Sequence, residues 1–535
     1  MHNNWFCNAI FYSLDVESFY DSNNDGIGDF KGLNSKLDYL ADLGVNCIWL
    51  LPFFPSPNRD NGYDVMDYYD IDKRLGTPED FTHCIEKASG LGIRLIIDLV
   101  VNHTSVEHPW FLQARQDPGS KYRDYYIWTD EPLAYEKEHL MFTGEENTMW
   151  TYDEVAGQYY LHRFYKEQPD LNIASEAVQK EILKIIQFWL SLGVSGFRID
   201  AAERLIESYG MKEVDKEKPL RFLNEMRSCI AALKSDAVLI AEANVPPQKV
   251  STYIRGNKRM HMVFNFYVNQ HLFLSLAEKN AQIISNALTS LPHLDAGSQW
   301  LNFLRHHDEL NLSLLSEKEI QKVFAEYAPE ENMRIYGRGI RRRLSPMVDG
   351  NRQQLEMYYS LLFSMPGVPL IRYGDEIGMG EDLSLKGRES VRTPMQWSDE
   401  KNGGFSEADK NMLVHPVISS GQYSYKYINV RGCQPDSRSL LNRMKKLIAI
   451  RKECPEIGLG QLIIFHSNNP RLFIHSYKWN DRQVYFIHNL SAEEVVFENN
   501  YGWEINSLLG SEREGKKTSG PIKGFEYKWF RVKLQ

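Results

Sequence analysis

The sequence is poor in the features that mark disulfide-bonded proteins. Its 535 residues contain six cysteines, at positions 7, 47, 84, 229, 433 and 454, and no Cys-x-x-Cys pair. Cysteines scattered in this way argue against a disulfide framework and favour reduced thiols in a cytoplasm. Cys47 and Cys84 lie in apolar segments, so we expect both to be small buried side chains.

Membrane and export signals are also missing. No apolar run reaches the length of a membrane span, and residues 1–5 show neither the basic nor the apolar region of a signal peptide. The formal net charge is -10 and the pI is near 5.9, which argues against nucleic acid or an anionic membrane as the main partner. We therefore expect a cytoplasmic protein that acts on a small molecule. The sequence leaves a homo-oligomer open.

What the sequence does contain is a repeated pattern of apolar strands and amphipathic helices. The predicted strands lie at 9–14, 45–51, 95–101, 194–200, 238–242, 300–308 and 367–373, and the first helices at 33–43 and 78–89. This alternation indicates an α/β fold with a parallel sheet. No Gly-rich phosphate turn follows the first strand, so a (β/α)8 TIM barrel is favoured over an open sheet.

The alternation breaks in two places, which predicts three domains. A segment at 104–170, rich in aromatic and acidic residues, follows the third strand and is expected to form a small inserted lid domain. After the helix at 440–452, antiparallel strands predict a β-sandwich domain at the carboxyl end, over 453–535. The catalytic barrel would then comprise residues 1–103 and 171–452.

Three acidic residues each end an apolar run. Asp200 closes the strand that contains Arg198, and Glu242 and Asp308 close two later runs in the same way. Because the carboxyl ends of barrel strands carry the chemistry, we expect these three acids to form one active site. For the Arg198–Asp200 pair alone, a structural ion pair is the simpler alternative.

Oxygen-bearing residues at alternate positions in the segment 21–29 predict a calcium loop. Hard oxygen donors with this spacing suit Ca²⁺, although the Glu that closes an EF-hand is absent because position 32 is Gly. An Asx-rich turn without metal is the alternative, and Mg²⁺ stays open as the ion. The candidate ligands are Asp21, Asn23, Asp25, Ile27 and Asp29.

Four short segments resemble the sequence regions of the α-amylase superfamily, glycoside hydrolase family 13. They lie at 98–105, 196–201, 241–244 and 305–309, and the segment 168–172 resembles a fifth region. The segments at 50–57, 306–310, 339–344, 373–380 and 391–397 are similar to the trehalose synthases of this family, which interconvert maltose and trehalose. The resemblance covers nearly the whole chain and follows the family's order.

The resemblance implies a role for each acid. Asp200 would be the nucleophile, Glu242 the general acid and base, and Asp308 the group that stabilises the transition state. Arg198 would keep Asp200 ionised, whereas Glu242 needs burial or nearby negative charge to stay protonated.

The resemblance also implies residues that hold the sugar. Asp64 and Arg392 would close the pocket at the non-reducing end of the substrate. The complete set of expected sugar-binding residues is Tyr63, Asp64, His103, Arg198, His307, Glu309 and Arg392. A second calcium site is implied at Asn102, Asp170 and Glu207, for which ordinary loop hydrogen bonding is the alternative. No organic cofactor is expected.

Two positions depart from the trehalose synthase pattern. His306 stands where those enzymes typically carry Asn, and Asp15 stands where they usually carry His. Either change could alter the pocket rim or the handling of the acceptor, and neither touches the three acids.

Three functions remain open from the sequence. The first is a retaining α-glucosyl transfer that interconverts maltose and trehalose, and the second is an α-glucosidase that hydrolyses maltose-type α-1,4 disaccharides. The third is a non-catalytic glycan-binding or transporter-associated barrel. The last is disfavoured because all three acids are present and no membrane anchor is seen.

Overall fold

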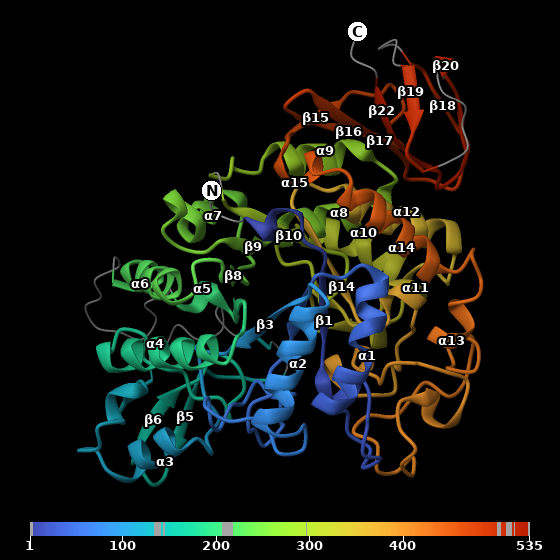
Figure 1. Cartoon of the computed structure of the whole chain (residues 1–535). Coiled ribbons are helices and arrows are strands. Elements are labelled where there is room, and N and C mark those ends of the chain that lie inside the picture. Colours follow the sequence, from blue (N-terminus) through green and yellow to red (C-terminus); the bar gives the residue numbers. More distant parts are fainter. Residues whose placement is uncertain are drawn as a thin grey trace.

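A closed barrel of eight parallel strands forms the centre of the molecule (Figure 1). The computed structural model describes residues 4–132, 141–142, 145–205, 218–295, 297–499, 504–509, 516–517 and 519–532. Around the barrel the strands are β1 (Phe11–Leu14), β14 (Val368–Arg372), β10 (Gln299–Phe303), β9 (Met262–Phe264), β8 (Val238–Ala241), β7 (Gly196–Ile199), β3 (Arg94–Leu99) and β2 (Cys47–Leu50). The predicted barrel is confirmed.

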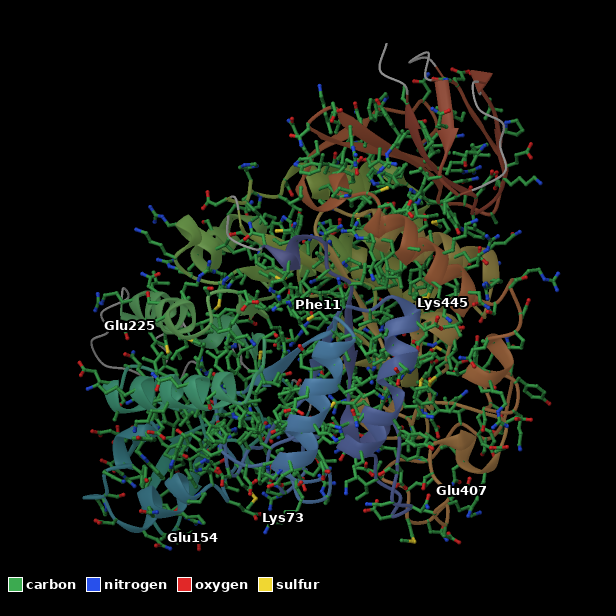
Figure 2. The ribbon with its side chains drawn as sticks, viewed as in Figure 1. Phe11, Lys73, Glu154, Glu225, Glu407 and Lys445 are labelled. Atoms are coloured by element: carbon green, nitrogen blue, oxygen red, sulfur yellow. The ribbon has the colours of Figure 1, made fainter. Side chains whose placement is uncertain are left out.

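Helices surround the strands and bury their apolar faces against them. The longer ones are α1 (Phe30–Leu43), α2 (Pro78–Gly90), α4 (Glu176–Ser191), α6 (Lys218–Leu233), α8 (Phe266–Glu278), α12 (Arg352–Ser364) and α14 (Leu440–Lys452). In α1, the Asp29 carboxylate caps the amino end and Gly44, at φ 95°, ends the helix in the left-handed conformation. Phe11 of β1 lies in the interior, whereas Lys73 and Glu407 lie at the periphery (Figure 2).

Strand β9 is absent from the sequence-based prediction. It has three residues, Met262–Phe264, all of them buried, and pairs with β8 and β10. A run this short shows no periodicity of its own, so its assignment depends on its neighbours in the sheet. The predicted strands at 95–101 and 300–308 are also longer than β3 and β10, because their last residues belong to the loops that carry the site.

The segment after β3 forms a small antiparallel sheet. It contains α3 (Pro109–Gln116) and the strands β4 (Trp128–Thr129), β6 (Gln158–Leu161) and β5 (Trp150–Asp153), in that order across the sheet. Single bridges join His103 to Asp170 and Tyr126 to Leu171, so both ends of the segment are fixed beside the barrel.

A second short sheet follows β10. Its strands are β11 (Leu310–Asn311), β13 (Gly339–Ile340) and β12 (Arg334–Ile335), with α10 (Glu317–Tyr327) between β11 and β12. Arg342, next to β13, forms an ion pair of 2.8 Å with Glu381. This sheet brings the residues after β10 close to the segment that follows β14.

At the carboxyl end, a six-stranded antiparallel sheet packs on α12. Its strands, in spatial order, are β15 (Gln461–Phe465), β16 (Leu472–Trp479), β17 (Arg482–Asn489), β22 (Tyr527–Val532), β19 (Glu504–Ser507) and β20 (Lys516–Lys517), and β18 (Val495–Phe497) pairs with β21 (Gly520–Ile522). The Ser360 hydroxyl of α12 lies 2.8 Å from His488 Nε2 and accepts a hydrogen bond of 2.8 Å from Trp529 Nε1.

The cysteines and the described helices bear on two expectations from the sequence. All six cysteines are unpaired, and Cys47 and Cys84 are fully buried as predicted. Within the described ranges, we find no helix whose length and apolar character would suit a membrane crossing.

Candidate active site

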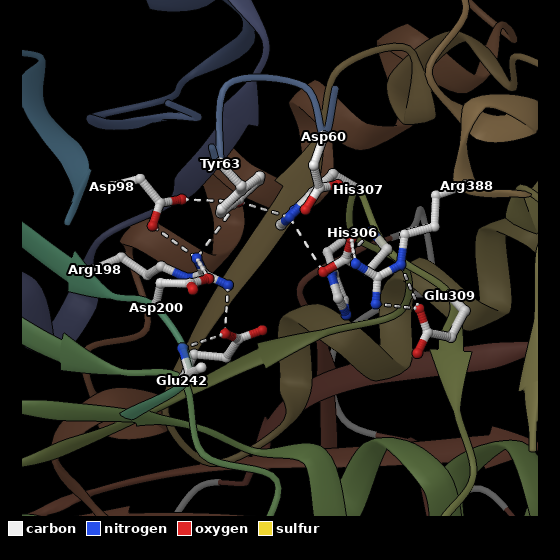
Figure 3. Close-up of polar contacts among 12 residues, drawn as sticks. Asp60, Tyr63, Asp98, Arg198, Asp200, Glu242, His306, His307, Glu309 and Arg388 are labelled. Atoms are coloured by element: carbon white, nitrogen blue, oxygen red, sulfur yellow. Dashed lines mark hydrogen bonds and ion pairs between the residues drawn. The ribbon is translucent and has the colours of Figure 1, made fainter. Parts of the chain in front are cut away.

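The three predicted acids converge at the carboxyl ends of the barrel strands. Asp200 follows β7, Glu242 follows β8 and Asp308 lies a few residues after β10. All three line one cavity of about 80 Å³. Figure 3 shows two of them, Asp200 and Glu242, on either side of the Arg198 guanidinium. Of the expected sugar-binding residues, Tyr63, His103 and Glu309 line the same cavity.

Arg198 joins the carboxylates on the inner side of the cavity. Its guanidinium lies 2.7 Å from Asp98, 2.6 Å from Asp200 and 2.6 Å from Glu242 (Figure 3). The side chain is 1% exposed, so these charges interact in a medium that screens them little. A single buried cation therefore holds the expected nucleophile and the expected acid side by side.

The ionisation of Asp200 differs in part from the expectation. Burial raises the pKa of Asp200 to about 7, and the charges of Asp98 and Asp308 act in the same direction against Arg198. Arg198 does favour the charged form, but it does not outweigh burial. Burial raises the pKa of Glu242 further, to about 8, with Asp200 and Asp308 adding to the effect. Burial thus raises the pKa of both acids, so that a protonated carboxyl is available beside the Arg198 guanidinium near neutral pH.

Asp308 is held as a carboxylate by two arginines. Its Oδ1 lies 2.9 Å from Arg388 and 3.0 Å from Arg392, and its Oδ2 lies 3.2 Å from His307 Nε2. Although burial acts the other way, these groups, led by Arg388, hold the pKa of Asp308 well below its usual range. A fixed negative charge therefore faces the cavity, as transition-state stabilisation requires.

The two predicted histidines are neutral hydrogen-bonding groups. His307 stacks on Tyr63 with ring centroids 5.5 Å apart, and its Nε2 lies 2.8 Å from the Tyr63 hydroxyl. His103 Nε2 lies 3.2 Å from the Tyr63 carbonyl oxygen. Burial lowers the pKa of His103 to about 4 and that of His307 well below its usual value. Both rings are thus uncharged, and His103 lines the cavity, whereas His307 lies behind the lining beside Tyr63 and Asp308.

Asp64 and Arg392 both line an outer pocket but form no direct bond with each other among the described residues. Asp64 turns back into its own loop, where it accepts hydrogen bonds from the Ser56 hydroxyl and the Arg59 N–H. Asp60, four residues earlier, lines the cavity. Burial raises the pKa of Asp60 to about 6, and the nearby charge of Arg392 opposes that rise in part. Both acids occur in one tight turn, so which of them faces the cavity depends on backbone geometry that the sequence pattern does not reveal.

Arg388 is a site residue that the sequence analysis missed. Besides Asp308, it bonds Glu309 at 2.8 Å, and it lies over the rings of Phe142 and Tyr336. Asp60 and Arg388 line both the inner cavity and an outer pocket of about 450 Å³. The arginine therefore stands at the boundary between the two spaces. In the sequence, its position shortly before Arg392 was the one sign that it could belong to the site.

An aromatic cluster from two different segments flanks this boundary. Phe142 stacks on Tyr165, with centroids 4.4 Å apart, and also contacts Tyr336 at 5.1 Å. The Tyr165 and Tyr336 hydroxyls lie 3.4 Å apart. The segment after β3 and the sheet after β10 thus meet over the cavity.

The loop at 21–29 is closed by its own hydrogen bonds. Asp21 accepts from the Asn24 and Gly26 N–H groups, at 2.7 and 2.8 Å, and Asp29 caps α1. Its oxygen donors suit a hard cation in kind. Among the described residues, however, the acidic and histidine groups close enough to share an ion are His306, His307 and Asp308, not the carboxylates of this loop. Calcium here stays a prediction.

The second predicted calcium site contains a guanidinium. Arg163 lies 2.7 Å from the Asn102 side-chain oxygen and forms a short ion pair with Asp170. The two oxygens expected to bind the ion therefore already have a cationic partner, and a metal at this position would have to displace it. The third predicted ligand, Glu207, lies outside the described residues.

The two departures from the family pattern have different positions. His306 lines the cavity. Asp15 does not, since its side chain caps the short helix that follows β1 by accepting from the Glu17 N–H.

Comparison with known proteins agrees with this geometry. A model of the α-amylase catalytic domain matches residues 16–460. The chain is 41% identical over 471 residues to the trehalose synthase/amylase TreS of Mycolicibacterium smegmatis, which spans 87% of this chain and 79% of that protein. It is 40% identical to the trehalose synthase of Thermus thermophilus, over 92% of this chain and 51% of that longer protein.

A solved structure shows the same architecture. The trehalulose synthase MutB from Pseudomonas mesoacidophila is similar with a TM-score of 0.80 and 26% identity, and the match covers 99% of each chain. With the family model matching most of its length, the chain belongs to the α-amylase family and is an enzyme of that superfamily.

Proposed function

We propose that this enzyme interconverts maltose and trehalose by moving a glucosyl unit within one enclosed site. The relatives at 40 and 41% identity are named trehalose synthases. The observation that carries the proposal is the boundary formed by Arg388, which separates the small inner cavity from the outer pocket. A glucose released inside would meet this boundary before it met bulk water.

The first chemical step breaks the bond of maltose with Asp200 and Glu242 in separate roles. Asp200 attacks the anomeric carbon, while Glu242 protonates the oxygen that leaves with glucose. Burial raises the pKa of Glu242 to about 8, which favours the protonated form that a general acid needs, and Arg198 favours the charged form of Asp200. Asp308 supplies negative charge beside the positive charge that develops on the sugar ring.

The second step uses the same groups in reverse. The released glucose turns so that its anomeric hydroxyl faces the glucosyl unit bound to Asp200. Glu242, now a carboxylate, takes the proton of that hydroxyl as its oxygen attacks, and the bond to Asp200 breaks to give trehalose. Two displacements at one carbon retain its configuration, so we propose a retaining mechanism.

One product assay tests the proposal. Purified enzyme is incubated with maltose labelled with ¹³C in both rings, in an excess of unlabelled glucose. We expect trehalose with both rings labelled, because transfer within the site excludes exchange with free glucose. Glucose as the sole product would refute the proposal and favour the maltose-hydrolysing α-glucosidase, in which water reaches the intermediate first.

We further propose that a hard cation, Ca²⁺ or Mg²⁺, strengthens the loop at 21–29. The oxygen chemistry of Asp21, Asn23 and Asp25 supports this. The loop reaches the segment after residue 400, since Asp21 accepts a hydrogen bond of 2.5 Å from the Ser406 hydroxyl. The ion would stabilise the fold, and the catalytic groups above act without it.

A further inference from the structure

His306 carries a hydrogen-bond donor that has no partner in the described part of the protein. The side chain is 3% exposed and lines the inner cavity. Its Nδ1 accepts from the Asp308 N–H at 3.3 Å, so the proton of the neutral ring lies on Nε2. That Nε2–H makes no hydrogen bond to the described residues.

A buried donor without a partner costs free energy unless a ligand supplies the acceptor. The ring is packed edge-on against Phe303, with centroids 4.9 Å apart, and against Phe266 at 5.9 Å. These contacts limit the directions in which the ring can turn to find another partner. Burial also keeps the ring neutral, since it lowers the pKa of His306 well below its usual value. His306 therefore offers one uncharged donor to the contents of the cavity.

A metal ion is a poor candidate for that partner. His306, His307 and Asp308 are close enough to share an ion. However, Arg388 and Arg392 already lie 2.9 and 3.0 Å from the Asp308 carboxylate. A divalent cation there would be repelled by both guanidinium groups.

The position of the ring indicates which part of the substrate it meets. In Figure 3, His306 lies between Glu242, which faces the leaving oxygen, and the Arg388 guanidinium at the boundary of the cavity. Tyr63 and His307, two of the expected sugar-binding residues, stack together, and Figure 3 shows them above His306 in this view. The unpaired donor is thus apart from that pair and on the side of Glu242, the group that protonates the leaving oxygen.

We infer that His306 is a specificity-determining residue that donates its Nε2–H to a hydroxyl of the glucose that leaves and then returns. The inference rests on the proposed transfer between maltose and trehalose. Holding that glucose keeps it near the intermediate and favours transfer over attack by water.

The test replaces the donor while keeping the ring. His306→Phe retains an aromatic side chain for the contacts with Phe303 and Phe266 but has no nitrogen. His306→Gln restores a donor, and His293→Phe makes the same change at an exposed histidine as a matched control. Should His306→Phe fail to fold, His306→Leu takes its place with the same expectations.

Two reactions are measured for each variant. With maltose, we expect the trehalose-to-glucose ratio of His306→Phe to fall about three- to tenfold, which is the effect of one neutral hydrogen bond, with partial recovery in His306→Gln. With p-nitrophenyl α-glucoside, whose leaving group needs no such bond, nitrophenol release should fall by a smaller factor than trehalose formation. A loss shared by both reactions reports the Asp308 N–H, whose acceptor Nδ1 is removed as well. The KM for added glucose as acceptor should rise.

The role of His306 and the proposed function would fail with different results. An unchanged product ratio in His306→Phe, or a parallel loss of nitrophenol release, would overturn the role of His306. If the parent enzyme makes no trehalose from maltose, the proposed function fails. The KM for glucose as acceptor of the glucosyl unit from p-nitrophenyl α-glucoside then still decides the inference: a rise in His306→Phe supports it and no change refutes it.

Discussion

Three carboxylates in this site share one buried cation, Arg198. Arg198 contacts Asp98, Asp200 and Glu242, so each carboxylate is stabilised by the same guanidinium and destabilised by the other two acids. Burial dominates the balance and places the pKa values of Asp200 and Glu242 near neutrality. The burial and the charged neighbours of each carboxyl group, rather than its residue type, therefore determine which one can act as the acid and which as the nucleophile.

Replacing the nucleophile should abolish turnover without unfolding the protein. Asp200→Asn keeps an oxygen that accepts from Arg198 but cannot form the glucosyl intermediate. We expect kcat for maltose to fall by about four orders of magnitude or more. Circular dichroism and the Tm, which should stay close to those of the parent, serve as controls. Undiminished turnover would show that another residue attacks the sugar.

The pH dependence of activity should be a narrow bell. Asp200 must be ionised, so kcat/KM should rise as pH increases through about 7, the pKa to which burial raises this group. Glu242 must be protonated, so kcat/KM should fall as pH increases through about 8. Asp308 is ionised over this whole pH range, so its titration should not change the pH profile.

A second substrate serves as the control for the fall in kcat/KM at alkaline pH. An aryl glucoside with a good leaving group needs no general acid for the first step. Its kcat/KM should therefore fall much less on the alkaline side than that of maltose. Equal alkaline limbs for both substrates would contradict the assignment of Glu242 as the acid.

Among the elements, β7 depends on one residue without a side chain, Gly196. Gly196 opens the strand at φ 148°, and a Cβ atom there would lie 2.2 Å from the Val238 carbonyl oxygen of β8. The pairing of β7 with β8 sets the positions of Arg198 and Asp200 relative to Glu242. A small residue is thus required where the catalytic strand begins.

Gly196→Ala should destabilise the protein by about 2–4 kcal/mol, because both the backbone angle and the contact with β8 become strained. Denaturant unfolding measures the change. Gly90→Ala is the matched control, since no atom of the described residues lies within 4 Å of the Cβ that alanine would add there, and its φ is ordinary. At the end of α2 it should stabilise slightly. Equal effects of the two substitutions would refute the argument.

The contact between the segment after β3 and the sheet after β10 should affect how much glucose is formed beside trehalose. Tyr165→Ala removes the stacking with Phe142 and the hydroxyl contact with Tyr336, so water should enter more often. We expect the share of glucose among the products of maltose to rise several-fold, as measured by chromatography. Tyr152→Ala, at a 51% exposed position in the same insertion, should leave the product ratio unchanged. A ratio unaffected by Tyr165→Ala would mean that the cluster does not exclude water.

At the scale of the whole molecule, a bound cation should raise thermal stability. Protein stripped with a chelator should melt about 2 °C lower than protein with excess Ca²⁺, as expected for an ion that binds the folded chain alone. Asp25→Ala should remove the response, because Asp25 is an exposed member of the loop and its loss spares the buried Asp21. A Tm that changes with neither Ca²⁺ nor Mg²⁺ would contradict the proposed cation site and show that hydrogen bonds alone hold the loop.

The barrel and its acids were predictable from the sequence because they repeat a local pattern. Asp200 and Glu242 each end an apolar run, and that alone places them at one end of a parallel sheet. Arg388 and Asp60 were not predictable, since their roles depend on segments far apart in the chain meeting over the cavity. The raised pKa of Asp200 was missed for a similar reason: burial, not the adjacent Arg198, sets it.

The Ser360 hydroxyl forms hydrogen bonds with two residues that are translated much later than α12. Its two partners, His488 and Trp529, follow it by 128 and 169 residues. A nascent chain that has emerged from the ribosome only as far as the last barrel helix has α12 exposed on its outer face. All eight barrel strands precede residue 373, whereas the outer face of α12 stays uncovered until β17 and β22 have been translated.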